Sequence, residues 1–233
     1  MRFFDEERRG SPLEAVAASR QAAGDNSVTG MPLTNLHVLE ETVVGGDAYT
    51  ASTLARVRVG EVAWQWHREV VFVRVLPHLA SEPVVVNRFR ESLSLWLRHY
   101  VPNNPDLFHV EMDAEPFAVF AYDSGLSLAS ICRALTSSLP LPRSIAERIL
   151  DAVYFGLRSR HELGFAHGAV SLNSVAITDE GNVTLGVGAP WDPDASPRDD
   201  IRRAERLSRD LLARSRAIST PHETLLEFAN QFR

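Results

Sequence analysis

Residues 161–190, HELGFAHGAVSLNSVAITDEGNVTLGVGAP, constrain the fold more than any other part of this 233-residue chain. Two apolar triplets, at 175–177 and 183–185, flank the sequence Asp-Glu-Gly-Asn, which is typical of two strands joined by a hairpin turn. One strand follows the loop at 167–174, and the other leads into the loop at 186–190. Because paired strands would hold these loops side by side, we expect a functional site between them.

The apolar pattern changes from strand-like to helical along the chain. Three strand-like segments, at 36–44, 49–59 and 63–76, are joined by short turns and predict an antiparallel sheet. The spacing becomes helical at 83–100, which predicts an amphipathic helix after the third strand. The elements expected next are strands at 107–112 and 116–122 and helices at 127–135, 143–163, 198–214 and 221–232.

The sequence contains no lysine, so all 24 basic residues are arginines. Chemistry that needs a lysine amine, such as a P-loop lysine or a Schiff base, is therefore excluded. The net charge of −6 argues against a nucleic-acid partner, because phosphate contacts require a basic face. The eight histidines show no compact metal-ligand spacing, so no metal site is expected.

Cys132 is the only cysteine, and no apolar run approaches about 20 residues. A single cysteine excludes an intrachain disulfide and favours a reducing compartment. The charged N-terminal sequence lacks the apolar core of a signal peptide. We therefore expect a cytoplasmic protein that does not span or bind a membrane.

The order of the elements and three short motifs resemble the protein kinase superfamily. Residues 161–167, HELGFAH, are similar to the run that enters the kinase catalytic loop. Residues 71–76 are similar to the strand that carries the phosphate-binding lysine, and residues 117–125 are similar to the fifth strand and hinge. The resemblance implies an α+β, kinase-like fold with two lobes.

This resemblance divides the chain into three parts. Residues 1–33 would form an N-terminal extension with a short helix and a linker. Residues 34–123 would form the N-lobe, with a five-stranded antiparallel sheet and one helix. Residues 124–233 would form a truncated, mainly helical C-lobe. The Ala-rich composition, with arginine as its only strong base, favours a bacterial member that resembles bacterial serine/threonine kinases.

The positions that carry catalysis in the family hold other residues here. Ala169 stands where the catalytic aspartate belongs, and alanine cannot accept a substrate proton. Ser174 stands at the metal-binding asparagine, and Gly186 stands at the metal-binding aspartate, where it supplies no oxygen ligand. Arg74 matches the strand lysine, and Glu91 is its expected ion-pair partner on the following helix.

The remaining matches describe a vestigial nucleotide site and its support. Gly45 and Gly46 are all that remains of the glycine-rich loop, and a plain hairpin turn is the simpler interpretation. His167 matches the largely structural histidine of the catalytic loop, and Asn173 lies one position before the metal-binding site. Asp200, at the start of a helix, matches the acid that braces the loop.

These losses predict a catalytically inactive pseudokinase without a cofactor, acting as a protein-binding scaffold or regulatory subunit. Trp64 and Trp66 point to the same side of a strand and form either core or a surface for a protein or peptide partner. One alternative is an atypical nucleotide-dependent kinase or transferase whose reshaped metal site uses Asn173, Asp192 or Asp194. The other alternative is a sensor that binds ATP without turnover.

Overall fold

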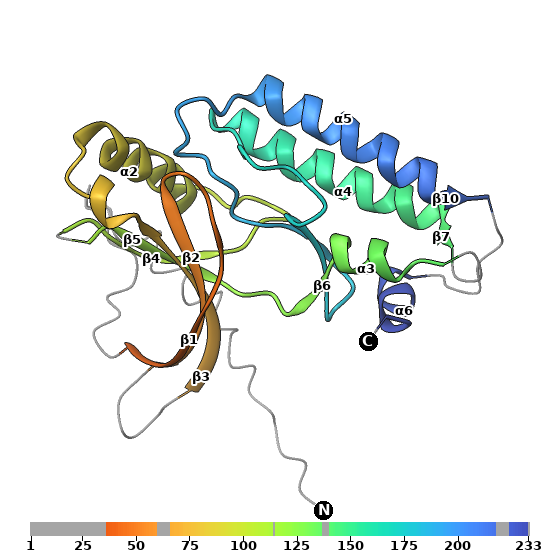
Figure 1. Cartoon of the computed structure of the whole chain (residues 1–233), viewed down its shortest axis with the longest axis horizontal. Helices are drawn as coiled ribbons and strands as arrows, with labels where there is room; N and C mark the ends of the chain where they lie inside the picture. The colour runs from red at the N-terminus through yellow and green to blue at the C-terminus, as the bar shows by residue number, and fades with distance from the viewer. Residues whose placement is uncertain (1–35, 60–65, 114, 137–139, 218–223, 233) are drawn as a thin grey trace, which may run out of the picture.

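The computed structural model describes residues 36–59, 66–113, 115–136, 140–217 and 224–232. These residues form two lobes, one built on a sheet with a single helix and one mainly helical (Figure 1). This arrangement confirms the expected α+β class and the five-stranded antiparallel sheet. The expected N-terminal extension and Trp64 lie outside the described residues. So does the side chain of Trp66, and the surface expected there stays a prediction.

The sheet of the N-lobe is antiparallel throughout, with the order β1-β2-β3-β5-β4. Between its third and fourth strands lies a helix whose first residue is a proline, which has no N–H to leave unpaired there. The elements are β1 (Leu36–Gly46), β2 (Thr50–Val59), β3 (Trp66–Val75), the 3-10 turn η1 (Pro77–Leu79), α2 (Pro83–Arg98), β4 (Leu107–Glu111) and β5 (Phe117–Ala121).

Strand β3 is apolar on both faces because a different cluster covers each one. Val73 and Val75 pack with the buried face of α2, which presents Phe89, Leu93 and Trp96. The alternate residues of β3 pack in a separate cluster on the opposite face of the sheet. A strand buried on both faces has a nearly continuous apolar sequence, which explains the run VVFVRVL.

The C-lobe contains a small three-stranded sheet with the order β6-β8-β9, surrounded by helices. Strand β6 begins at Gly125, in the segment that resembles the kinase hinge, and pairs with β8. The elements are β6 (Gly125–Ser127), α3 (Leu128–Ala134), β7 (Leu141–Pro142), α4 (Arg143–Glu162), β8 (Val175–Thr178), β9 (Val183–Leu185), α5 (Pro197–Arg214), β10 (Ser215–Arg216) and α6 (Leu225–Asn230).

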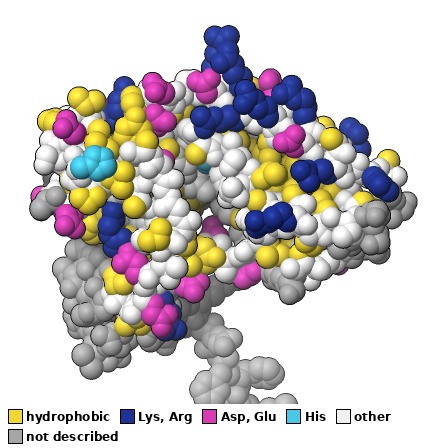
Figure 2. All heavy atoms as spheres, viewed as in Figure 1, with side chains coloured by type: hydrophobic (Ala, Val, Ile, Leu, Met, Phe, Trp, Pro, Cys, Tyr) yellow, Lys and Arg dark blue, Asp and Glu magenta, His cyan; other side chains and the backbone are white. Residues whose placement is uncertain are grey.

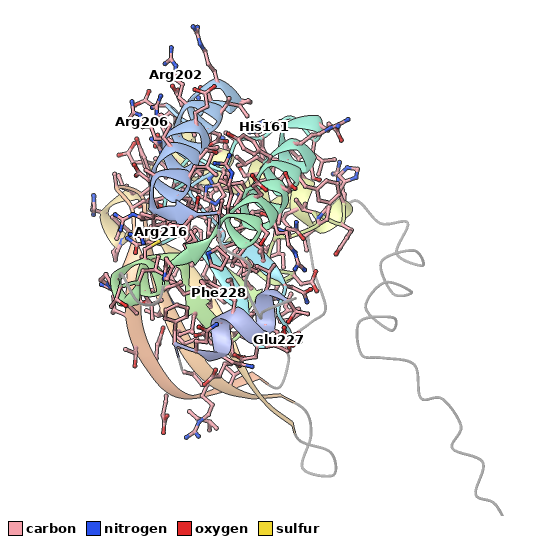
Figure 3. All side chains as sticks on the ribbon, turned by 90° about the vertical axis from the view of Figure 1, so that its right-hand side faces the viewer. His161, Arg202, Arg206, Arg216, Glu227 and Phe228 are labelled. Atoms are coloured by element: carbon pink, nitrogen blue, oxygen red, sulfur yellow. The ribbon has the colours of Figure 1, made fainter. Side chains whose placement is uncertain are left out.

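Helices α4 and α5 lie side by side along one edge of the C-lobe (Figure 1). Helix α5 buries Asp200, Ala204, Leu207 and Leu211 and exposes all six of its arginines. Basic side chains accordingly gather along this edge (Figure 2), and Arg202 and Arg206 project from its outer side (Figure 3). No helix in the described ranges is both long and apolar enough to cross a membrane.

Helix α6 begins with a capping box, in which the Thr224 side chain accepts from the Glu227 N–H and the Glu227 side chain accepts from the Thr224 N–H, both at 3.1 Å. The expected start of this helix, at residue 221, lies outside the described residues. Phe228 then points into the C-lobe core and is 1% exposed (Figure 3).

A continuous apolar cluster joins the two lobes, and we call it the interlobe cluster. The N-lobe contributes buried residues from β3, α2, β4 and β5, including Phe89 and Trp96. The C-lobe contributes Phe165, Ala189 and Trp191, which lie within or next to the two loops of the hairpin segment. The space between the lobes near these loops is therefore filled with apolar side chains.

Candidate functional site

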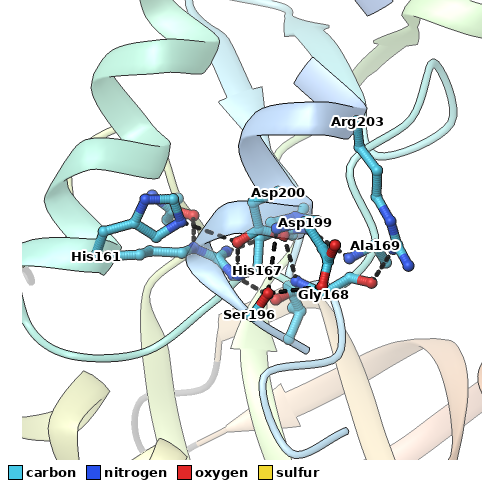
Figure 4. A network of polar contacts seen from close by, with 12 residues as sticks. His161, His167, Gly168, Ala169, Ser196, Asp199, Asp200 and Arg203 are labelled. Carbon is cyan, nitrogen blue, oxygen red and sulfur yellow. Dashed lines mark hydrogen bonds and ion pairs between the residues drawn. The ribbon is translucent and has the colours of Figure 1, made fainter. Parts of the chain in front are cut away.

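The loop at 167–170 is held in place by Asp200, which is fully buried in the first turn of α5 (Figure 4). Its Oδ2 accepts a hydrogen bond from the His167 N–H at 2.6 Å, and its Oδ1 accepts one from the Gly168 N–H at 2.9 Å. The His161 Nε2 lies 2.9 Å from the same Oδ2. The structure thus places Asp200 beneath the loop, where the resemblance to kinases predicted a brace.

The start of α5 explains why Asp200 points inward. Ser196 caps the helix by accepting a hydrogen bond from the Asp199 N–H, and Pro197 occupies the first helical position. Counting from this cap puts Asp200 on the same helix face as the buried Ala204. Asp199 lies on the outer side, where its carboxylate pairs with Arg202 at 3.1 Å.

His167 ties the two loops of the site to each other. Its Nδ1 accepts a hydrogen bond from the Ala169 N–H at 3.1 Å, so its Nε2 carries the proton and donates to the Gly186 carbonyl at 3.0 Å. Burial holds the pKa of His167 well below its ordinary value, and the nearby Arg160 guanidinium lowers it further. The ring is therefore neutral and acts as a structural cross-link.

Arg160 is a residue of this site that sequence reasoning missed. It is fully buried on α4, and its guanidinium donates to the carbonyls of Gly186 and Val187, both at 2.8 Å, and to Asn104 Oδ1 at 2.6 Å. The guanidinium also stacks on Trp96, 4.5 Å from the ring centroid. Burial lowers the pKa of Arg160 to about 9, which still leaves it charged at neutral pH.

A sequence signal for Arg160 was available. The residue falls three positions after Leu157 and seven after Val153, so it shares the helix face that carries the apolar positions of α4. A basic residue on an apolar helix face needs buried acceptors.

The acids expected of an active site are absent from the loops in the described structure. Ala169 is half-buried, and the Ser174 hydroxyl only closes a local turn, donating to the Ser171 carbonyl at 3.0 Å and accepting from the Ser171 N–H at 2.9 Å. Gly186 offers only its carbonyl, which Arg160 and His167 already occupy. No group of three His, Cys, Asp or Glu residues in the described ranges could hold a metal ion.

Two of the residues suggested for a reshaped metal site, Asn173 and Asp192, lie in different loops. Asn173 is exposed to solvent. Asp192 accepts a hydrogen bond from the Asp194 N–H at 2.9 Å, which closes a local turn before α5. The metal site suggested there stays a prediction.

The expected ion pair between Arg74 and Glu91 is wrong. Arg74 pairs with Glu41 of β1 and donates to Thr53 Oγ1 of β2 at 2.8 Å. It also stacks on Phe72, 4.6 Å from the ring centroid, on the face of the sheet opposite α2. Glu91 lies on the exposed side of α2. The cause is strand alternation, because the residues of β3 that face α2 are valines on either side of Arg74.

The Arg74 pair stabilises the edge of the sheet rather than a nucleotide site. A hydrogen bond from Thr53 and the pairing with Arg74 lower the pKa of Glu41, although partial burial opposes this shift. The two charged side chains are each 34% exposed, so the pair is partly screened by water. The face of β3 that the kinase lysine would occupy is apolar here.

The turn between β1 and β2 is a closed hairpin that Asp47 stabilises. Gly45 and Gly46 end β1 and pair with β2. The Asp47 Oδ1 accepts hydrogen bonds from the N–H groups of Tyr49 and Thr50 at 2.6 and 2.8 Å. The Tyr49 and Thr50 N–H groups of this turn are therefore already paired and not free to bind a phosphate, and the nearest side chain is anionic.

Comparison with known proteins supports the fold through solved structures only. No protein-family model matches this sequence, and no curated protein sequence matches it. The crystal structure of the Mycobacterium tuberculosis PknI kinase domain is similar, with a TM-score of 0.58 and 15% sequence identity. That match covers 87% of this chain and 96% of the PknI chain. At this identity the likeness concerns the fold alone.

Two variants of the same PknI domain match equally well. A single-substitution variant has a TM-score of 0.59 and 16% identity, covering 87% of this chain and 96% of its own. A double variant has a TM-score of 0.57 and 16% identity, covering 88% and 96%. The chain therefore has a protein kinase-like fold, as its motifs predicted.

Proposed function

We propose that this chain is a pseudokinase, which uses its kinase-like fold as a protein-binding scaffold or regulatory subunit and does not transfer phosphate. The observation that carries the proposal is the chemistry of the loops: Ala169 and Gly186 occupy the positions of the catalytic and metal-binding carboxylates. Phosphoryl transfer consists almost entirely of positioning and charge neutralisation. A site without these groups lacks the mechanism.

The surroundings of the loops support the same proposal. The described side chains of β3 that face α2 are valines, which supply no cation to hold nucleotide phosphates. The carboxylate of Asp47 in the β1–β2 turn would repel a phosphate group. The loop nevertheless keeps its brace, its histidine and the buried Arg160, which all serve its shape. Retention of shape without reactive groups fits a protein that is recognised by a protein or peptide partner.

The direct test combines nucleotide binding with phosphate transfer on the full chain. We expect no thermal stabilisation by millimolar ATP, with or without Mg²⁺, because a ligand that binds the folded state must raise its stability. We also expect no transfer of radiolabelled γ-phosphate to the chain or to a generic protein substrate, measured beside an active protein kinase as a positive control.

Each positive result would identify a different function. Stabilisation by ATP that requires Mg²⁺, together with phosphate transfer, would contradict the proposal and favour the atypical transferase. Asp192→Asn and Asp194→Asn would then identify the metal ligands by abolishing both signals. Stabilisation by ATP without Mg²⁺ and without transfer would favour the nucleotide sensor.

A further inference from the structure

We infer that Trp191 is a latch between the two lobes, which joins the β1–β2 turn to the chain between β9 and α5 and fills the space beneath that turn. The indole is 1% exposed and stacks on Phe89 of α2, with ring centroids 4.9 Å apart. Its Nε1 donates to Asp47 Oδ2 at 3.1 Å, across 144 positions of sequence. One side chain of the C-lobe therefore contacts both the turn and the helix of the N-lobe.

The backbone on either side of the indole is also fixed. The Ser92 hydroxyl, on the buried side of α2, donates to the Pro190 carbonyl at 3.3 Å. The Ala189 N–H donates to the His167 carbonyl at 2.7 Å. Gly188 has a φ of +71°, and a Cβ there would lie 2.2 Å from the same carbonyl, so only glycine fits. Residues 188–191 are thus pinned between the loop at 167–170 and the N-lobe.

Asp47 couples the turn to the latch because one carboxylate serves both. Its Oδ1 closes the turn through two backbone N–H groups, while its Oδ2 accepts from the Thr50 hydroxyl at 2.8 Å and from the indole. Loss of the indole would leave Oδ2 with fewer partners, and loss of the carboxylate would leave a buried indole N–H unpaired. Each side of the contact therefore stabilises the other.

The position of the latch gives it a consequence for ligands. In the fold that the chain resembles, the turn between the first two strands covers the nucleotide phosphates. Here that turn closes on the chain's own indole, so a phosphate-bearing ligand would have to displace Trp191 first. Release of the latch would expose Phe89 and the indole of Trp191. These two rings are buried against each other in the closed state and would then form an apolar surface. This inference concerns the contact itself and holds whether or not the chain transfers phosphate.

Hydrogen exchange of the full chain, without nucleotide, tests the coupling in both directions. Trp191→Phe keeps an aromatic ring against Phe89 and removes the N–H donor. Loss of one hydrogen bond is worth about 0.5–1.5 kcal/mol, so we expect amides 46–50 to exchange about two- to tenfold faster. Asp47→Ala should accelerate exchange at residues 189–195 by a similar factor.

Trp96→Phe is the matched control. Trp96 belongs to the same interlobe cluster and also donates through Nε1, but to the Pro105 carbonyl at 3.1 Å rather than to a residue of the turn. It should leave exchange at 46–50 unchanged. If Asp47→Ala fails to fold by circular dichroism, Asp47→Asn replaces it, since an amide still closes part of the turn.

Two results would overturn the latch. One is unchanged exchange at 46–50 in Trp191→Phe, and the other is an equal acceleration there in Trp96→Phe. Both readouts are independent of phosphate transfer, so failure of the latch and failure of the proposed pseudokinase function are separate observations.

Discussion

At the scale of single residues, Asp200 shows that a loop without its reactive acid still depends on a buried acid for its shape. The carboxylate has lost water and regains hydrogen bonds from two loop N–H groups and from His161. Buried backbone N–H groups need acceptors whatever the loop does chemically. This requirement gives a physical reason for a carboxylate at 200 beside alanine at 169.

Asp200→Asn should therefore destabilise the protein strongly. The amide keeps the shape but turns an NH₂ group toward donors that need an acceptor, and we expect a loss of about 2–4 kcal/mol in the free energy of unfolding. Urea denaturation followed by circular dichroism measures this loss. The neighbouring Asp199→Asn is the control, because that carboxylate is on the outer side of α5. Equal losses for the two variants would contradict the brace.

The buried ring of His167 leads to a second prediction, which concerns how the free energy of unfolding depends on pH. Its pKa is lowered in the folded state, so the unfolded state takes up a proton as the pH falls through 6.5 while the folded state does not. The free energy of unfolding should decrease below that pH. The contribution of this residue approaches about 1.4 kcal/mol for each pH unit between about pH 6 and pH 5.

The variant His167→Gln isolates this contribution, because the carboxylates titrate alike in both proteins. We expect its free energy of unfolding to fall less steeply than that of the natural chain over this pH interval. Parallel curves would show that the ring takes up a proton in the folded state.

At the scale of elements, helix α4 works as the support for the turn after β9. Its apolar face forms the C-lobe core, and the last turn of that face presents Arg160 to the carbonyls of Gly186 and Val187. The cation costs free energy to bury, but its three hydrogen bonds and the ring of Trp96 compensate for the lost water. The helix thus links the core of the C-lobe to the interlobe cluster.

Arg160→Met should cost about 3–5 kcal/mol, because it leaves the Val187 carbonyl and the Asn104 amide oxygen without their donor and the Gly186 carbonyl with His167 alone. Arg158→Met, on the exposed side of the same helix, removes only a surface pair with Glu162 and should cost about 0–0.5 kcal/mol. Denaturant titration of both variants gives the comparison. A loss at Arg160 no larger than that at Arg158 would mean that solvent replaces these bonds.

At the scale of the whole molecule, the interlobe cluster makes the two lobes one packed unit. Trp96 lies 5.0 Å from Phe120 and 5.7 Å from Phe165, measured between ring centroids, so residues from both lobes share one apolar core. Lobes that share a core are expected to unfold together. The shared core also explains why the region between the lobes is packed near the loops.

We therefore expect one unfolding transition, with coincident midpoints for tryptophan fluorescence and far-UV circular dichroism. Phe165→Ala removes a C-lobe ring from the interlobe cluster and should lower stability by about 3–5 kcal/mol and separate the two midpoints. Phe228→Ala, within the C-lobe core, should also destabilise the protein but keep the midpoints coincident. Two separate transitions in the natural chain would contradict a shared core.

Much of this protein could be read from its sequence, because the deciding features are local. The order of strands and helices follows from the apolar period, and the kinase-like fold follows from that order with its motifs. The identity of Ala169 and Gly186, and the complete lack of lysine, need no coordinates. A side chain that the sequence lacks cannot be supplied by folding.

The tertiary structure alone decided where the remaining side chains point and what they contact. A shift of one residue in a strand reverses the face of the sheet, which is why Arg74 meets Glu41 instead of Glu91. Arg160 and Trp191 find their partners in distant segments, and Asp47 is 144 positions from the indole it holds. Such contacts depend on how the lobes pack, and local patterns of sequence contain no measure of that packing.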